Sequence, residues 1–223
     1  MRIKTAGVRS IVAVAAILLP LLLQAQQKLF PVDFSAEKFV YEKAHPEQVM
    51  MIGKVYVGQG RLRQEMHPPQ GPQVVYLVDP AGGHMWQMMP DRKTAVDMGE
   101  MFRKMGEAMG ASKGMMETLK PTNISKPCGD SKYVTCQEVG TEVVGGRSTQ
   151  KWEFTHTGMG APTKSYQWID PKLYIAVKVE TNTSVTELRN IKEGSQPAEL
   201  FEVPAEYHKM TSQDMQPNGK HPQ

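Results

Sequence analysis

Apolar and polar residues alternate over most of this chain, in short runs separated by turn residues. A period of two is typical of β-strands with one buried face. About ten to eleven runs follow this pattern, at residues 33–42, 48–57, 61–66, 73–78, 84–89, 93–96, 139–144, 149–155, 164–169, 173–180 and 183–191. Because the connections between consecutive runs are mostly short, we expect neighbouring strands to pair antiparallel.

One long stretch, from Asp97 to Lys120, has a helical period instead. Asp97 is placed to cap the first turn, with Glu100 three residues later, and Pro121 ends the helix because it cannot continue the hydrogen-bond ladder. The apolar residues fall within an arc of about 140° on a helical wheel, which predicts an amphipathic helix. They are Met98, Met101, Phe102, Met105, Met109, Met115, Met116 and Leu119.

This helix is predicted to be loosely formed. Its apolar stripe is mostly methionine, a flexible side chain that suits adaptable surfaces. Gly106, Gly110 and Gly114 each cost a helix about 0.8–1 kcal/mol relative to alanine. Two interpretations stay open: the stripe packs permanently on the sheet, or the helix is a mobile lid over an apolar cavity.

A sheet with so many strands must curl, split or close. Curling around the helix would bury the methionine stripe together with the aromatic residues of the strands. The pattern therefore predicts a mainly β (α+β) fold, a strongly curved, half-open antiparallel β-barrel with one Met-rich helix across its concave face.

The N-terminus has the three parts of a secretory signal peptide. Basic residues precede the apolar run from Ile11 to Leu23, and Ala25 ends a small-residue cleavage site. We expect cleavage after Ala25, so that residues 1–25 are a signal peptide and the product is periplasmic or secreted. Residues 26–210 then form a single domain and residues 211–223 a disordered tail. The apolar run is shorter than the roughly 20 residues of a transmembrane helix, so the protein is not expected to span a membrane.

Charge argues against one class of partner. The chain has 26 basic and 23 acidic residues, and three basic residues and no acidic ones lie within 1–25, so 23 of each remain after cleavage. Without a basic excess, a nucleic acid is not an expected partner.

The two cysteines, Cys128 and Cys136, lie close together in a polar, turn-rich stretch. In an exported protein such a pair predicts a disulfide. The spacing is not CxxC and no histidine is adjacent, so neither a redox nor a metal site is indicated.

Several short motifs recur in order from about residue 30 to about residue 210. They are 60–65 (GRLRQE), Trp86 with Pro90 and Lys93, 145–147 (GGR) leading to Lys151-Trp152, 168–170 (WID), and 200–204 (LFEVP) before Tyr207. With the signal peptide and the meander of strands, they resemble the bacterial periplasmic lipoprotein-sorting carriers, the LolA-like superfamily. More closely, the chain resembles an uncharacterised exported branch of it.

This resemblance implies a half-barrel with an apolar cavity, and a carrier of lipoproteins or lipids. The sorting carriers also use an inward arginine on an early strand to hold the lid closed. Arg63 is the candidate by position, but the alternation places it on the opposite side from Leu62 and Met66. The carriers usually begin with a helix, whereas strand-like sequence begins here almost at the mature N-terminus.

The sequence carries no recognisable catalytic motif, so we expect no enzyme, no catalytic residue and no cofactor. A cluster of thioether and imidazole ligands could select Cu(I). On a strand, however, His84 and Met88 would point to one face and Met85 and Met89 to the other. No metal site is therefore assigned, and a Cu(I)-binding protein is a minor alternative.

The leading hypothesis is an exported, non-enzymatic carrier or chaperone-like protein. Its ligand would be a lipid, an acyl chain, a lipoprotein or another apolar molecule, and an envelope protein is a further candidate partner. The alternative is a protein-binding module with a filled core. The candidate apolar lining is Met98, Met101, Phe102, Met105 and Met109 of the helix with Trp86, Trp152, Tyr166 and Trp168 of the strands.

Overall fold

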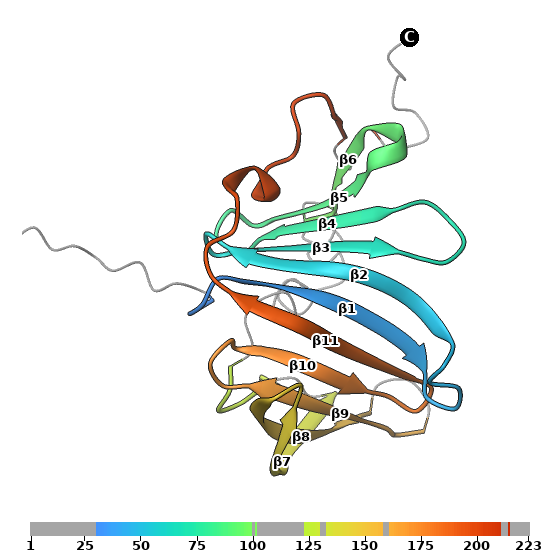
Figure 1. The fold of residues 1–223 in the computed structure, drawn as a ribbon, viewed down its shortest axis with the longest axis vertical. Helices are drawn as coiled ribbons and strands as arrows, with labels where there is room; N and C mark the ends of the chain where they lie inside the picture. Colours follow the sequence, from blue (N-terminus) through green and yellow to red (C-terminus); the bar gives the residue numbers. More distant parts are fainter. Residues whose placement is uncertain are drawn as a thin grey trace, which may run out of the picture.

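The computed structural model describes residues 30–99, 101, 123–129, 133–157, 161–210 and 214. Within them, twelve strands form one sheet (Figure 1). The first half contains β1 (Phe34–Glu42), β2 (Val49–Gly58), β3 (Arg61–His67), β4 (Val74–Asp79), β5 (His84–Met89), the 3-10 helix η1 (Pro90–Arg92) and β6 (Thr94–Asp97). The second half contains β7 (Val134–Val144), β8 (Arg147–His156), β9 (Thr163–Asp170), β10 (Ile175–Glu180), β11 (Ser184–Glu193), the 3-10 helix η2 (Ala198–Phe201) and β12 (His208–Met210).

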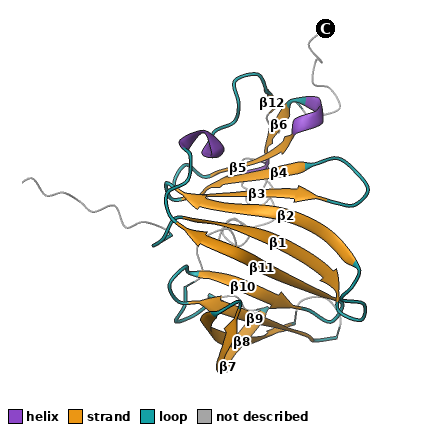
Figure 2. Cartoon of the chain, in the orientation of Figure 1, coloured by secondary structure: helices purple, strands orange, loops and turns teal. Residues whose placement is uncertain are grey.

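The strands follow the order β12-β6-β5-β4-β3-β2-β1-β11-β10-β9-β8-β7. Every pairing is antiparallel except that of β12 with β6, which is parallel. Strands β7 and β12 are the two edges of the sheet, so it is open. Figure 2 shows that it is also curved. The predicted open, curved and mainly antiparallel sheet is confirmed.

The predicted strand count was too low because β12 was missed. Its three residues are too few to display an alternating pattern, and it forms only where the chain returns to β6, with the His208 amide donating to the Lys93 carbonyl at 2.7 Å. Two strand boundaries were also wrong. Strand β7 begins at Val134, and Leu173 lies in a turn before β10 because the Asp170 carboxylate accepts hydrogen bonds from the amides of Lys172 and Leu173.

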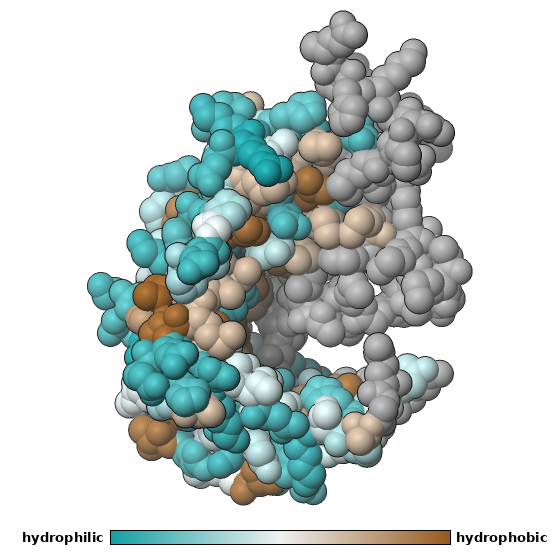
Figure 3. Space-filling model, turned by 90° about the vertical axis from the view of Figure 1, so that its right-hand side faces the viewer, coloured by the Kyte–Doolittle hydropathy of each residue, from teal (hydrophilic) through white to brown (hydrophobic). Residues whose placement is uncertain are grey.

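The pairing register assigns each residue to a face, because residues directly opposite each other in neighbouring strands point the same way. One cross-strand row joins Phe34, Val57, Leu62, Val78 and Met85. The opposite face carries η2, which lies in front of the sheet in Figure 1. Figure 3, turned by 90° from Figure 1, shows the described residues as a wall that is hollowed on one side. This is the side at the back of Figure 1, opposite η2, so we call the η2 side the convex face and the Phe34 side the concave face.

The convex face is covered at one end by the C-terminal segment. Phe201 of η2 is 2% exposed and packs with a cluster on β4, β5 and β6: Val75, Leu77, Met88 and Ala95. Gly58 makes room for it, since a Cβ at that position would lie 2.7 Å from the Phe201 ring. The concave face contributes the larger core, which includes Phe34, Val55, Val57 and Leu62.

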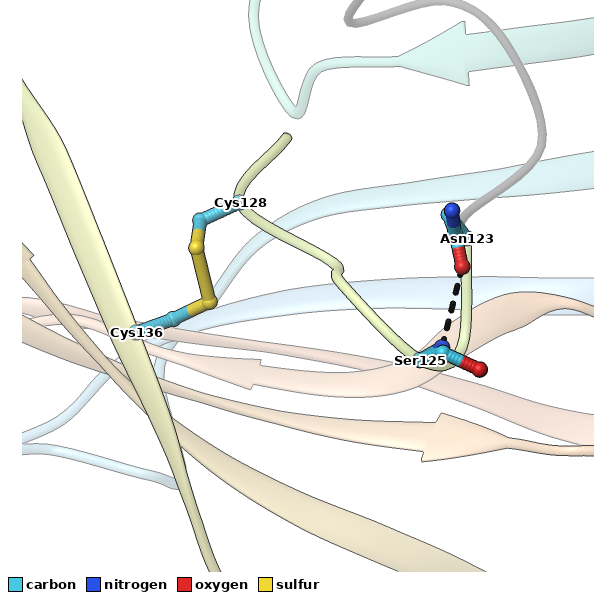
Figure 4. Close-up of a disulfide and its surroundings, with 4 residues drawn as sticks. All are labelled: Asn123, Ser125, Cys128 and Cys136. Atoms are coloured by element: carbon cyan, nitrogen blue, oxygen red, sulfur yellow. Dashed lines mark hydrogen bonds between the residues drawn. A yellow bond between two sulfur atoms is a disulfide. The ribbon is translucent and has the colours of Figure 1, made fainter. Parts of the chain in front are cut away.

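The disulfide between Cys128 and Cys136 is confirmed (Figure 4). Cys136 lies within β7, and Cys128 belongs to the turn segment 123–129, in which Asn123 Oδ1 accepts a hydrogen bond from the Ser125 amide at 3.0 Å. Ile124 and Cys128 pack against Trp152, Phe154 and Ile169. The disulfide therefore holds this segment against the β7–β9 end of the sheet.

The first residues of the predicted helix are helical. Met98, Gly99 and Met101 have helical conformation, and the Gly99 amide donates to Asp97 Oδ1 at 3.0 Å, which confirms the predicted cap. Residues 100 and 102–122 lie outside the described residues, so the length of the helix and its position across the concave face stay predictions. The predicted signal peptide and most of the C-terminal tail also lie outside them. No helix among the described residues is long and apolar enough to cross a membrane.

Replacing both cysteines, Cys128→Ser with Cys136→Ser, should lower the free energy of unfolding by about 2–3 kcal/mol, because the short covalent loop no longer restricts the unfolded chain. Urea denaturation of the wild type with and without reductant provides the comparison. The double variant should unfold at the midpoint of the reduced wild type and should not respond to reductant. Equal midpoints for oxidised wild type and variant would contradict the stabilising role.

Candidate functional site

Three cross-strand rows run over the middle of the concave face and define its surface. The first joins Ala36, Val55, Gln64, Tyr76, Gln87 and Val96. The second joins Leu188, Lys38, Gly53, Met66 and Val74. The third joins Gln167, Val179, Thr186, Val40 and Met51.

Burial divides this surface into two parts. Toward the Phe34 end of the strands, Ala36 and Val55 are buried. Toward the opposite end, Val40, Met51 and Met66 are only half-buried. Val40, Met51 and Met66 thus form the less completely buried part of this face.

Lys38 lies between these two parts and is the only charged residue in the three rows. It is half-buried, and its Nζ donates to Gln64 Oε1 at 3.1 Å. Burial lowers the pKa of its ammonium group, because removal from water disfavours the charged form. Within the described part of the chain, no carboxylate forms an ion pair with it. Lys38 was not predicted from the sequence as a site residue. Its alternation with Phe34, Ala36 and Val40, which places all four on one face of β1, could have indicated it.

Trp152 is the second polar feature of the concave face. Its row continues that of Gln167, and the residue is 9% exposed. Its indole Nε1 is buried without a hydrogen-bond acceptor among the described residues, and Gln150 Oε1 on the same strand is buried without a donor among them. A buried indole N–H normally has a partner, so this donor is an exception among the described residues.

The four aromatic residues predicted to line one cavity do not share a face. Tyr166 and Trp168 do point the same way, as the alternation predicted, but Trp168 lies opposite Lys178, in a row that continues through Glu187 to Phe39 on the convex face. Trp86 is also on the convex face, where it packs with the Phe201 cluster. By register Trp152 lies on the concave face, while Trp168 and Tyr166 also contact the core cluster that contains Phe34. Alternation shows which residues share a face but not which face of the folded sheet it is.

Trp168 contacts charged side chains of the neighbouring strands. Its ring lies between the ammonium groups of Lys151 and Lys178, each 4.8 Å from the ring centroid, and its Nε1 donates to Glu142 Oε2 at 2.7 Å. The hydrogen bonds from Lys151 Nζ and Trp168 Nε1 lower the pKa of the Glu142 carboxyl. Such cation–π contacts between strands stabilise the sheet across its width.

Arg63 also lies on the convex face, as its alternation with Leu62 and Met66 predicted. Its Nε donates to Glu65 Oε1 at 2.8 Å and its Nη1 to the Leu200 carbonyl at 3.1 Å. Arg61 makes a matching contact, at 3.2 Å, to the Phe201 carbonyl. Both arginines therefore fasten η2 to β3, on the side of the sheet away from the hollow.

Of the helix residues predicted to line a cavity, Met98 and Met101 are helical and half-buried. Phe102, Met105 and Met109 lie outside the described residues. Their contact with a ligand stays a prediction.

The imidazole and thioether groups considered for copper are divided between the faces. His84 and Met88 point to the convex face, and Met85 to the concave face, because they alternate on β5. His84 Nδ1 lies 2.7 Å from Asp97 Oδ2, an ion-pair partner rather than a soft metal ligand. In the part of the chain that the structure describes, no three His, Cys, Asp or Glu side chains are grouped to hold a metal ion.

The sequence did not predict one pair of residues, a histidine and a serine, of types that are common in active sites. His156 Nε2 lies 3.0 Å from Ser165 Oγ, across neighbouring strands. A nucleophilic serine also needs a group that orients the histidine, and no described carboxylate bonds to His156. The contact is a cross-strand hydrogen bond, not an assembled catalytic site.

No protein-family model matches the chain, and no curated protein matches its sequence. Among solved structures it is similar to MucB in the MucA/MucB complex of Pseudomonas aeruginosa, with 11% identity, 81% of this chain and 59% of that chain covered, and a TM-score of 0.45. It is similar to the lipoprotein LppX of Mycobacterium tuberculosis, with 14% identity, 74% and 87% covered, and a TM-score of 0.37. The LolA superfamily protein NE2245 from Nitrosomonas europaea matches with 12% identity, 77% and 90% covered, and a TM-score of 0.35.

These matches are likenesses of fold at low sequence identity, and they include a protein of the LolA superfamily and a domain named for lipoprotein sorting. The chain spans little more than half of the MucB chains that it matches, 55% to 59%. These matches do not identify a ligand for this chain.

Replacing Arg63 with methionine should lower the free energy of unfolding by about 2 kcal/mol, because two hydrogen bonds from a largely buried charged group are lost. Urea denaturation measures this, with Arg189→Met as the matched control. Arg189 is half exposed on the same face, so its loss should cost less than about 1 kcal/mol. If Arg63→Met changed the binding of an apolar dye without lowering stability, Arg63 would contact the ligand or its lid instead.

Proposed function

We propose that this protein is an exported, non-enzymatic carrier or chaperone-like protein that shelters an acyl chain, a lipoprotein or another apolar ligand against the concave face of its sheet. The single observation that carries this proposal is the half-buried apolar surface of Val40, Met51, Met66 and Val74 inside the curve of an open sheet.

The energetics favour an extended apolar ligand. Each CH₂ group removed from water stabilises a complex by about 0.8 kcal/mol before the costs of ordering are subtracted. An acyl chain lying across several strands can bury many such groups, whereas a small polar molecule would find few partners among these side chains. Sites of this kind are mostly apolar, with a few polar groups that orient the ligand.

The two faces differ in a way that supports the concave location. The row from Phe39 through Glu187 and Lys178 to Trp168 and Lys151 joins charged and aromatic groups of the convex face to one another. An apolar chain placed there would have to displace these contacts. On the concave face it would replace water beside alkyl and thioether groups, which is favourable.

Export is supported by the disulfide, since such bonds persist in oxidising compartments. Together with the predicted cleavage after Ala25, this supports a periplasmic or secreted protein. An envelope protein that delivers or receives the ligand is the partner that such a carrier would need.

The adjacent residues Met51 and Ile52 provide a matched test, because they point to opposite faces of β2. Met51→Gln should weaken the binding of an apolar fluorescent dye about tenfold, the cost of burying an unpaired amide beneath an apolar ligand. Ile52→Gln, at a position that is 49% exposed on the convex face, should change the affinity less than twofold. Dye titration of both variants, each checked for unchanged thermal unfolding, measures the difference.

Native mass spectrometry of gently purified protein tests the proposal directly. Lipid that copurifies in a defined ratio supports a carrier. Absence of both copurifying lipid and dye binding would overturn the proposal in favour of a protein-binding module with a filled core.

A further inference from the structure

We infer that Lys38 and Gln64 form a head-group site on the concave face, and that the ligand is an amphiphile with an anionic head, a carboxylate or a phosphate. This inference rests on the proposed function and specifies the chemical class of its ligand. It is carried by the position of one charged side chain among the otherwise uncharged residues of the three rows.

The position of Lys38 suits a head group at the inner end of an apolar track. It lies in the middle of β1, with Leu188 opposite on β11 and Gly53 opposite on β2. Gly53 contributes no side chain, and a Cβ there would lie 2.2 Å from the Glu65 carbonyl oxygen, so the gap in the row is a requirement of the backbone. On the solvent side, the half-buried Val40 and Met51 continue the surface on which a tail could lie.

The charge of Lys38 is not balanced by the described residues. Its ammonium group has three donors, and the one described acceptor is the neutral amide oxygen of Gln64. Other lysines of the sheet differ in this respect. Five of them lie within 4.0 Å of a carboxylate, in the pairs Lys43–Glu180, Lys151–Glu142, Lys164–Glu153, Lys172–Glu193 and Lys178–Glu187.

A partly buried, unpaired cation is costly to stability unless something compensates for it. An anion from a ligand would do so, since hydrogen bonds between an ammonium group and a carboxylate or phosphate are about twice as strong as neutral ones. The Gln64 Nε2 carries two more donors beside the Lys38 site. Together these donors match the several oxygens of an acidic head group better than the single hydroxyl of an alcohol.

Three C16 amphiphiles distinguish the head groups: hexadecanoic acid, hexadecyl phosphate and hexadecanol. Their affinities are measured for the full chain at neutral pH by displacement of an apolar dye. We expect the acid, the phosphate or both to bind the wild type ten- to a hundredfold more tightly than the alcohol, the contribution of a charge-assisted hydrogen bond. The tighter of the two anions identifies the head group.

Variants of Lys38 then locate the preference. Lys38→Met should abolish it by weakening the anions while leaving the alcohol within about threefold, and Lys38→Arg should retain it. Lys54→Met, which removes an exposed lysine from the convex face of β2, is the matched control and should behave as wild type. The melting temperature of Lys38→Met should equal or exceed that of the wild type, because a buried charge has been removed.

The outcomes separate this inference from the proposed function. If hexadecanol binds the wild type as tightly as both anions, or if Lys38→Met keeps the preference, the head-group site is overturned while the carrier remains. If none of the three amphiphiles binds, the proposed function fails, and the head-group site fails with it. The wild-type comparison stands by itself should a Lys38 variant not fold.

Discussion

The pairing register of the sheet is the constraint on which the rest of this structure depends. Successive residues of a strand point to opposite faces, so a shift by one residue would exchange the two surfaces of the molecule. Register places Phe34, Val57 and Leu62 in one row and Tyr56, Arg63 and Leu77 in the next. The apolar hollow and the charged convex surface are therefore two consequences of the same set of backbone hydrogen bonds.

Contacts on the convex face connect strands across the width of the sheet. Cross-strand ion pairs and cation–π contacts connect β1 with β8 on one half, where Arg189 lies 4.8 Å from the Phe39 ring and Lys178 the same distance from that of Trp168. On the other half, η2 and the residues after it cover β4 to β6, with Phe201 inserted over Gly58. The concave side carries aliphatic and thioether groups such as Val40, Met51 and Met66 together with uncharged polar groups such as Gln64 and Gln87.

An open curved sheet with a hollow side is a compromise between stability and binding. A closed barrel filled with side chains would bury more apolar surface, but it would leave no room for a ligand. Here the Phe34 end is packed as a core, while the Val40 end keeps partly exposed apolar groups, with Lys38 at the boundary. Among the described residues, Lys38 has no carboxylate partner and the Trp152 indole has no acceptor. Both features lower stability, as do the half-buried apolar groups, which is typical of residues retained for binding.

The sequence alone determined the local features of this protein. Alternation placed most of the strands, paired Tyr166 with Trp168 and separated Arg63 from Leu62. Spacing predicted the disulfide, and an aspartate before an apolar run predicted the cap at Asp97. The tertiary structure decided which face each strand presents to the hollow, because the direction in which a sheet curls depends on contacts between residues far apart in the chain. That is why Trp86 packs on the face that carries η2, why Lys38 lies on the opposite face, and why β12 forms only where β6 offers a free edge.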